Sequence, residues 1–338
     1  MVKVFRKYSV LVMFGLLYLF SSCSKEIDLY TDYTPVPLVY CQVDPTDSFC
    51  FVTLSKSFQS FTDARDVLIN ADELKMNDAR IVLEVWGSKY KAWETGFSLI
   101  NPTIIGSASR VVSRSVYRSD KILHFHDPSL DSLPRLGTYD HFRLIITSPE
   151  FKQIIYSKVQ NIKAPIIRHP RTPIQFNLYG GKYSYFLFFI DKDEVKHVDF
   201  TCDFYYKEFT DKWIDRKAKL MLKTNMIVQD SIYIRMFEES FFNKLTNAIK
   251  EDPNVSSRLF VHMDFTLLVS DVYFHDYYMT YKGSKDNDYV FYSNIVNGMG
   301  LFSAKRKTTI SNIKGFDRMT FDSLCHGRFT KHLNFRDW

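Results

Sequence analysis

Glycine is scarce in this chain, which has only 12 glycines among 338 residues. Propellers and related repeated architectures need glycine at many turns, so this number argues against them. Cysteine is also scarce, and none of the five cysteines stands in a CxxC or Cys/His spacing typical of a zinc site or a redox dithiol. GxSxG, HExxH, Walker and GxGxxG motifs are absent as well. We therefore expect no enzyme, no cofactor and no metal, although a glycosidase pair of facing carboxylates would leave no such motif.

A concentrated charge of one sign is missing too. The formal net charge of +6 falls to +3 when the three bases Lys3, Arg6 and Lys7 are removed with the N-terminal segment described next. The remaining bases are scattered, and their tightest group is Lys305-Arg306-Lys307. This pattern does not indicate a nucleic-acid-binding surface.

Long hydrophobic runs are limited to the N-terminus. Residues 1–7 carry three positive charges, and Tyr8–Phe20 is an unbroken run of 13 apolar or small residues. A membrane-spanning helix needs about 20 residues, whereas a signal peptide needs a core of this length. The sequence predicts a signal peptide over 1–22.

The end of this segment indicates a lipid anchor. Ser21-Ser22-Cys23 resembles the bacterial lipobox, in which the cysteine is acylated and becomes the new N-terminus, although Phe20 replaces the usual leucine. Palmitate and related chains on Cys23 would hold the protein at a membrane. The alternative is an ordinary signal peptide followed by an incidental cysteine.

The residues after Cys23 bear on location. Ser24-Lys25-Glu26 resembles the surface-export tag of Bacteroidetes lipoproteins. Residues 26–35 are polar and lack periodicity, so the sequence predicts a tether over 23–35. We expect an outer-membrane protein that faces the cell surface rather than the periplasm.

Aromatic residues are abundant, with 30 Phe and 21 Tyr, and they favour strands and sandwich cores. Short alternating strand patterns separated by turns fill 36–164, which predicts an immunoglobulin-like β-sandwich. Three prolines within 165–173 predict a linker. Residues 174–338 predict a second β-rich domain with two helices, near 237–251 and 271–282. The fold class is therefore mainly β.

Two cysteines stand in the first predicted hairpin. Strands over 36–44 and 48–54 around a four-residue turn would place Cys41 opposite Cys50, on one apolar face. A cross-strand disulfide fits the oxidising envelope, whereas two buried thiols avoid the strain of such a bridge. Both alternatives stay open.

Several polar and aromatic groups are candidates for binding. His124 and His126 share one face of a predicted strand, as a zinc site or as exposed edge residues. Tyr273 and Tyr277 form a helical stripe, and Tyr289 follows in a second aromatic run. These three tyrosines predict either ligand contacts on an aromatic platform or core packing with hydroxyls at the rim.

The segment Ser293-Asn-Ile-Val-Asn-Gly-Met-Gly-Leu-Phe302 predicts a tight bend before a closing strand, or a ligand-contact loop. Together with Cys23-Ser-Lys-Glu-Ile-Asp28 and the strands over 37–56, 79–84 and 137–146, it resembles the Bacteroidetes lipoprotein family called domain of unknown function 4249. The resemblance implies an envelope lipoprotein that often accompanies TonB-dependent outer-membrane transporters, with no established chemistry.

The sequence therefore favours a non-catalytic accessory or ligand-binding partner of such a transporter. The alternative is a structural or adhesive surface lipoprotein. The ligand and the oligomeric state are not encoded in any motif of the sequence.

Overall fold

The structure is a computed structural model that describes residues 34–57, 74–100, 114–121, 123, 139–170, 175–283 and 292–337. Residues 36–338 group as one unit, separate from residues 1–35. The predicted signal peptide, Cys23 and nearly all of the tether lie outside the described residues.

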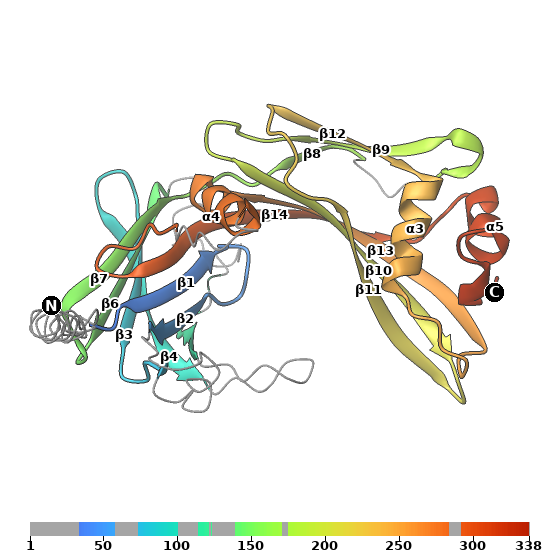
Figure 1. The fold of residues 1–338 in the computed structure, drawn as a ribbon. Helices are drawn as coiled ribbons and strands as arrows, with labels where there is room; N and C mark the ends of the chain where they lie inside the picture. Colours follow the sequence, from blue (N-terminus) through green and yellow to red (C-terminus); the bar gives the residue numbers. More distant parts are fainter. Residues whose placement is uncertain are drawn as a thin grey trace, which may run out of the picture. The chain divides into compact units, whose positions relative to one another are not determined.

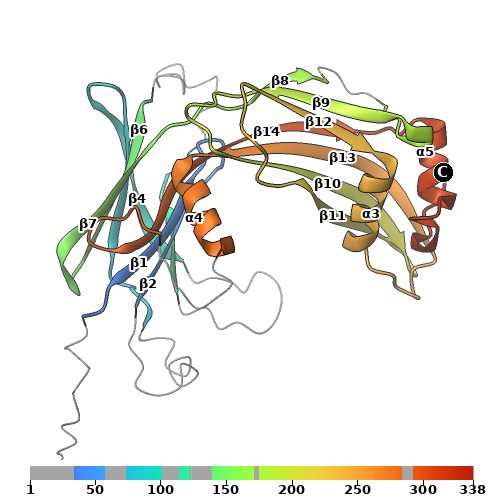
Figure 2. The same ribbon diagram turned by 45° about the horizontal axis from the view of Figure 1, so that its top comes forward.

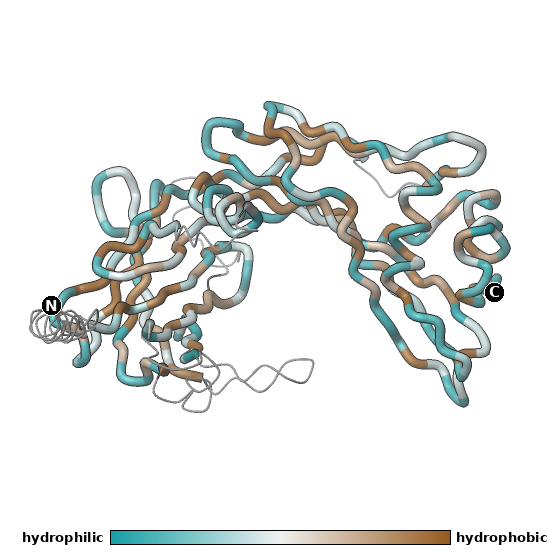
Figure 3. The backbone as a smooth tube through the Cα atoms, viewed as in Figure 1, coloured by the Kyte–Doolittle hydropathy of each residue, from teal (hydrophilic) through white to brown (hydrophobic). Residues whose placement is uncertain are grey.

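Eleven of the described strands form one hydrogen-bonded sheet, in the order β11-β10-β13-β14-β1-β2-β5-β4-β3-β6-β7 (Figure 1). Their side chains alternate between buried and exposed, and Figure 3 shows apolar and polar residues alternating along these strands. The strands are β1 (Pro37–Val43), β2 (Phe51–Lys56), β3 (Arg80–Trp86), β4 (Lys91–Ile100), β5 (Ser115–Ser119), β6 (His141–Ser148), β7 (Phe151–Gln160), β10 (His197–Phe209), β11 (Trp213–Lys223), β13 (Ser257–Ser270) and β14 (Met299–Ile313).

A second sheet has the order β12-β9-β8, formed by Ser231–Phe237, Tyr183–Phe189 and Ile166–His169. Its inner face packs on the large sheet through phenylalanine: the ring of Phe186 on β9 lies 4.8 Å from those of Phe200 on β10 and Phe265 on β13. Figure 2 shows the small sheet running beside these strands. Ring pairs at such distances add to the free energy gained by burial, so aromatic packing holds the two layers together.

The first strands enclose an aliphatic core that includes Val39, Leu54, Leu83 and Leu144. The sheet turns back on itself there, because Tyr156 of β7 forms a bridge with Val296, just before β14. The predicted mainly β fold with sandwich packing is confirmed.

Both predicted helices are present. Helix α3 (Glu238–Ala248) buries Phe241 and Leu245, and α4 (Val272–Gly283) begins where the Asp271 carboxylate accepts the Phe274 N–H at 3.0 Å. A third helix, α5 (Arg318–His326), is capped by Asp317 and was not predicted. Short 3₁₀ turns lie at η3 (Tyr179–Gly181) and η4 (Lys331–Leu333). None of the helices among the described residues is long and apolar enough to cross a membrane.

The linker prediction is wrong for residues 166–169, which form strand β8. Proline lacks an N–H to donate, but Pro165 and Pro170 flank this short strand, and β8 lies at the edge of its sheet, where proline is tolerated. Residues 171–174 lie outside the described residues.

The large sheet also continues across the expected domain boundary. Strand β14, from the second half of the chain, pairs in parallel with β1, with Val39 opposite Gly300. The division into two domains that fold independently stays a prediction, which limited proteolysis near 165–173 would test.

Candidate functional site

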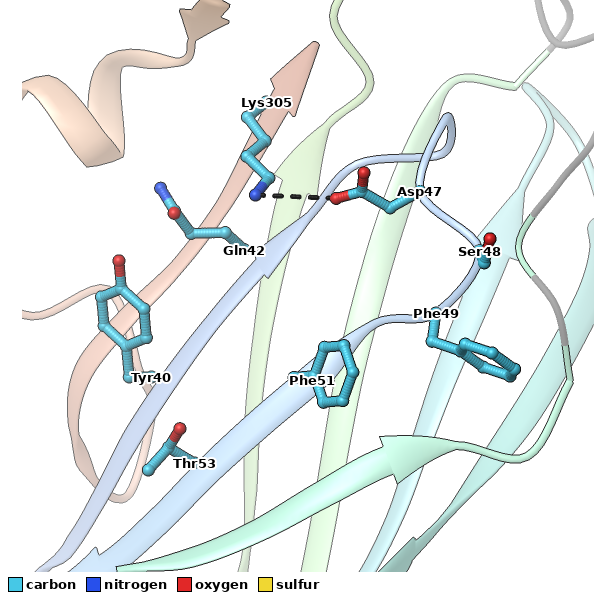
Figure 4. A pocket seen from close by; sticks show the side chains of 8 residues that line it. All are labelled: Tyr40, Gln42, Asp47, Ser48, Phe49, Phe51, Thr53 and Lys305. Carbon is cyan, nitrogen blue, oxygen red and sulfur yellow. Dashed lines mark ion pairs between the residues drawn. The ribbon is translucent and has the colours of Figure 1, made fainter. Parts of the chain in front are cut away.

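A pocket of about 410 Å³ lies on the outer face of β1 and β2. The two strands alternate, so Val39, Cys41, Val52 and Leu54 face the core and their neighbours face outward. Figure 4 shows the outward side chains around the pocket, together with one from β14 and those of the connecting loop. The lining residues are Tyr40, Gln42, Asp47, Ser48, Phe49, Phe51, Thr53 and Lys305.

The loop before β2 is fixed by its own hydrogen bonds. The Asp44 carboxylate accepts the backbone N–H of Thr46 at 2.9 Å and its hydroxyl at 2.6 Å, and the Asp44 carbonyl accepts the Asp47 N–H at 2.9 Å. Burial raises the pKa of Asp44, although these hydrogen bonds oppose the rise. The predicted turn over 44–47 is therefore present, and it presents Asp47 to the pocket.

The two charged residues that line the pocket, Asp47 and Lys305, have opposite signs. The Asp47 carboxylate lies 3.7 Å from the Lys305 ammonium and also pairs with Lys307. Burial, followed by the nearby Tyr277, raises the pKa of Tyr40 to about 12. The Tyr40 phenol is therefore neutral at physiological pH and can donate or accept a hydrogen bond.

Aromatic rings supply the apolar part of the lining. Phe51 is about half exposed, and the guanidinium of Arg118 lies 4.8 Å from the ring centre of Phe49. Tyr40 stands directly opposite Thr53 in the β1–β2 register. Rings beside an amide and a hydroxyl form a surface that suits a ligand with one apolar face and several hydrogen-bonding groups.

The predicted tyrosines contribute only in part. Tyr277 of α4 does not line the pocket, although its ring centre lies 6.1 Å from that of the lining residue Tyr40. Tyr273 packs half-buried against the core. Tyr289, His124 and His126 lie outside the described residues. Among the residues that are described, no group of three potential ligands could hold a metal ion.

Cys41 and Cys50 lie together in the core below the pocket, with their sulfur atoms 3.5 Å apart and both thiols reduced. The predicted register is wrong by two residues, since Cys41 stands opposite Val52 and Cys50 comes before β2 begins. Burial, followed by the hydrogen bond with Cys50, raises the pKa of the Cys41 thiol, which disfavours the reactive thiolate. A disulfide in the envelope stays a prediction.

The Asn294–Phe302 segment adopts the tight bend. Gly300 has a φ of +121°, and an added Cβ there would collide with the Val39 carbonyl oxygen. The Asn294 side chain closes the bend, accepting the Phe302 N–H at 2.9 Å and donating to the Phe302 carbonyl at 2.6 Å. This segment is therefore a structural joint between β1 and β14.

The pocket was not predicted from the sequence, although some of its lining residues stand out in the strand pattern. Tyr40 and Phe51 are large aromatics at outward positions of an otherwise alternating hairpin. The position of Lys305 in the pocket could not be predicted from the sequence, because it depends on the pairing of β14 with β1.

Comparisons with protein-family models and with curated proteins give no match for the chain. Similar solved structures include the C-terminal globular domain of oligosaccharyltransferase from Pyrococcus abyssi, with a TM-score of 0.19 and 10% identity, covering 85% of this chain and 52% of that chain. A tandem of titin immunoglobulin domains has a TM-score of 0.15 and 8% identity, covering 70% and 91%. The chain spans about half the length of the oligosaccharyltransferase structure.

Proposed function

We propose that this protein is a lipid-anchored outer-membrane protein that binds a small ligand at the β1–β2 pocket, as a non-catalytic accessory of a TonB-dependent transporter. The observation that supports this proposal most is the lining of the pocket, where Phe51 and Tyr40 lie beside Gln42 and Thr53. A volume of about 410 Å³ is of the size that holds a small molecule such as one or two sugar rings.

The charge pattern supports binding of an uncharged ligand. Asp47 and Lys305 are the two charged residues in the lining and have opposite signs, so the lining itself has no net charge; Lys307, which also pairs with Asp47, lies outside it. A neutral amphipathic molecule gains apolar contact with the rings and hydrogen bonds from the polar groups, and it does not lose the hydration energy of a charge.

Replacement of Phe51 by Ala tests the pocket. We expect it to weaken ligand binding about tenfold, because truncation removes a large part of the apolar lining. Calorimetric titration of neutral mono- and disaccharides and of short uncharged peptides would measure this effect. Trp213→Ala is the matched control, since Trp213 of β11 is about equally exposed and does not line the pocket. If no ligand binds, or if both variants weaken binding equally, the pocket has no such role.

The anchor and the partner need a separate test. The Cys23→Ala variant should leave the membrane fraction, and the unaltered chain should take up labelled palmitate. Pull-down of the lipidated protein from detergent-solubilised outer membranes should recover a TonB-dependent barrel in stoichiometric amount. Repeated absence of such a barrel, with membrane attachment intact, would favour the structural or adhesive alternative.

A further inference from the structure

The outer face of the β12-β9-β8 sheet carries an unusual set of side chains. Every second residue of β9 and β12 faces away from the core, as their burial patterns show. Four of these outward aromatic residues are between 40% and 46% exposed. We call this surface the aromatic–arginine face; it comprises Arg168, Tyr183, Tyr185, Phe189, Tyr233, Arg235 and Phe237.

The strand register places these side chains in rows. Tyr183 stands opposite Phe237, and Tyr185 stands opposite Arg235. The Arg235 guanidinium lies 5.2 Å from the ring centre of Tyr183 and 5.3 Å from that of Tyr233. It is thus held between two tyrosines by cation–π attraction, which restricts its position before any ligand arrives.

Arg168 is held in the same way, 4.7 Å from the ring centre of Phe189. Neither arginine forms an ion pair or a side-chain hydrogen bond with any described residue. This differs from Arg143 of β6, which lies 5.7 Å from the Tyr156 ring centre but also 4.0 Å from Glu84. The face therefore presents two fixed guanidinium groups without a carboxylate from the described part of the chain.

Acidic residues flank this face without lying at its outward strand positions. At one end, Asp191 pairs with Lys163 at 2.8 Å and Asp230 pairs with Lys192 at 3.0 Å. At the other end, Glu238 and Glu239 begin α3. The centre of the face is positive, and carboxylate or similar anions are its electrostatic complement.

The rings determine which anion fits. His169 stacks on Tyr185 with ring centres 4.0 Å apart, and the guanidinium groups cover one side of Tyr183 and Phe189. Nucleobases need open ring faces on which to stack, and these faces are partly covered. A sugar chain can use the parts of the rings that stay exposed, through single CH contacts, and it also accepts hydrogen bonds from groups such as the tyrosine hydroxyls.

We propose that the aromatic–arginine face binds an anionic polysaccharide, with uronic-acid carboxylates at Arg168 and Arg235 and sugar rings against the tyrosines. This site is separate from the β1–β2 pocket, since none of its residues lines that pocket. Each arginine can donate two parallel N–H groups to a planar carboxylate, a bidentate geometry that the point charge of a lysine does not reproduce.

The test uses the purified full-length protein and polygalacturonate, with fully methyl-esterified polygalacturonate as the matched neutral polymer. Affinity electrophoresis should show retardation by the charged polymer and little by the ester. The Arg168→Gln, Arg235→Gln double variant should bind at least about tenfold more weakly, because each charge-assisted contact contributes on the order of a factor of ten. Arg143→Gln, which alters an arginine that already has a carboxylate nearby, should leave binding unchanged.

Several outcomes would overturn the proposal. Equal binding of both polymers, no binding of the charged one, or tighter binding of single-stranded DNA would each do so. Equal losses in the double variant and in Arg143→Gln would do the same. The Phe51→Ala variant should retain full binding of polygalacturonate, so failure at this face and failure at the pocket are distinguishable. Thermal unfolding of each variant confirms that the fold is retained.

Discussion

Two contacts join segments that are far apart in the sequence, and their chemistry differs. At the start of β14, Gly300 joins this strand to β1 through close approach to the Val39 backbone, and the Asn294 side chain holds the preceding bend by hydrogen bonds with Phe302. Near the start of β13, the buried Arg258 guanidinium joins Glu208 of β10 to the carbonyl groups of Leu333 and Lys250. We call the first the glycine joint and the second the arginine clamp.

The two contacts attach distant segments by different means: the glycine joint by a close steric fit and the arginine clamp by an ion pair. The glycine joint depends on a position where only a hydrogen fits, so its contact needs no ionised group. The arginine clamp depends on an ion pair of 2.9 Å whose positive partner is almost fully buried. Burying such a charge costs free energy that only complete pairing offsets. The clamp should therefore be sensitive to loss of either partner, and the joint should be sensitive to added volume.

Replacement of Gly300 by Ala should have the largest effect. The new Cβ would collide with the Val39 carbonyl oxygen, and the positive φ would strain any side chain; these two costs add, so we expect a loss of about 5 kcal/mol or more in the free energy of unfolding. Urea unfolding measures this loss. Gly181→Ala is the control, because its φ is +80° and nothing lies within 4 Å, so only backbone strain of about 1 kcal/mol remains. Similar losses in both variants would contradict the role of close approach.

Replacement of Arg258 by Met should cost about 3–5 kcal/mol, because it leaves Glu208 with one partner fewer and two backbone carbonyls without their donor. Arg216→Met is the control: Arg216 donates to the same carboxylate at 2.8 Å but is half exposed, so its loss should cost less than about 1 kcal/mol. Chemical unfolding of both variants would measure the difference. If the two losses in the free energy of unfolding are equal, the burial of Arg258 does not determine how much the arginine clamp contributes to stability.

Sequence alone predicted the local features near both contacts. The glycine-rich bend and the helices near 237–251 and 271–282 were predicted from patterns of a few residues and are present in the structure. It also predicted that Cys41 and Cys50 share the apolar face, which their burial confirms.

The long-range pairings could not be predicted, because local patterns do not encode them. Val39 and Gly300 pair in parallel across most of the chain, and no turn sets their register. The hairpin register around Cys41 was wrong because the connection between β1 and β2 is longer than its four-residue turn. Helix α5 was missed because it is short and two of its four buried residues, Thr320 and Ser323, are polar. The pocket and the arginine clamp depend on these pairings, so neither could be assembled from the sequence.

The smallest effect concerns Asp271, an ionisable residue between β13 and α4 that contacts β14, the strand of the glycine joint. The buried Asp271 carboxylate accepts the Ala304 N–H of β14 at 2.7 Å, and burial raises its pKa from 3.8 to about 6 despite its backbone hydrogen bonds. Because the folded state holds the proton more tightly than the unfolded state, this group favours folding most below pH 3.8. That contribution is lost as the pH rises through about 6.

An Asp271→Asn variant should therefore change the pH dependence in a defined direction. Asparagine does not titrate, and it keeps one oxygen to accept either the Ala304 or the Phe274 N–H. The stability of the original chain relative to the variant should fall as the pH rises from 4 to 7, as measured by urea unfolding at several pH values. Gly300→Ala removes no titratable group, so the loss of stability that it causes should stay nearly constant over the same range. If the stability difference between the original chain and the Asp271→Asn variant also stays constant with pH, the ionisation of Asp271 does not affect stability. The contact at Ala304 would then depend on packing and neutral hydrogen bonds, as the contact at Gly300 depends on packing.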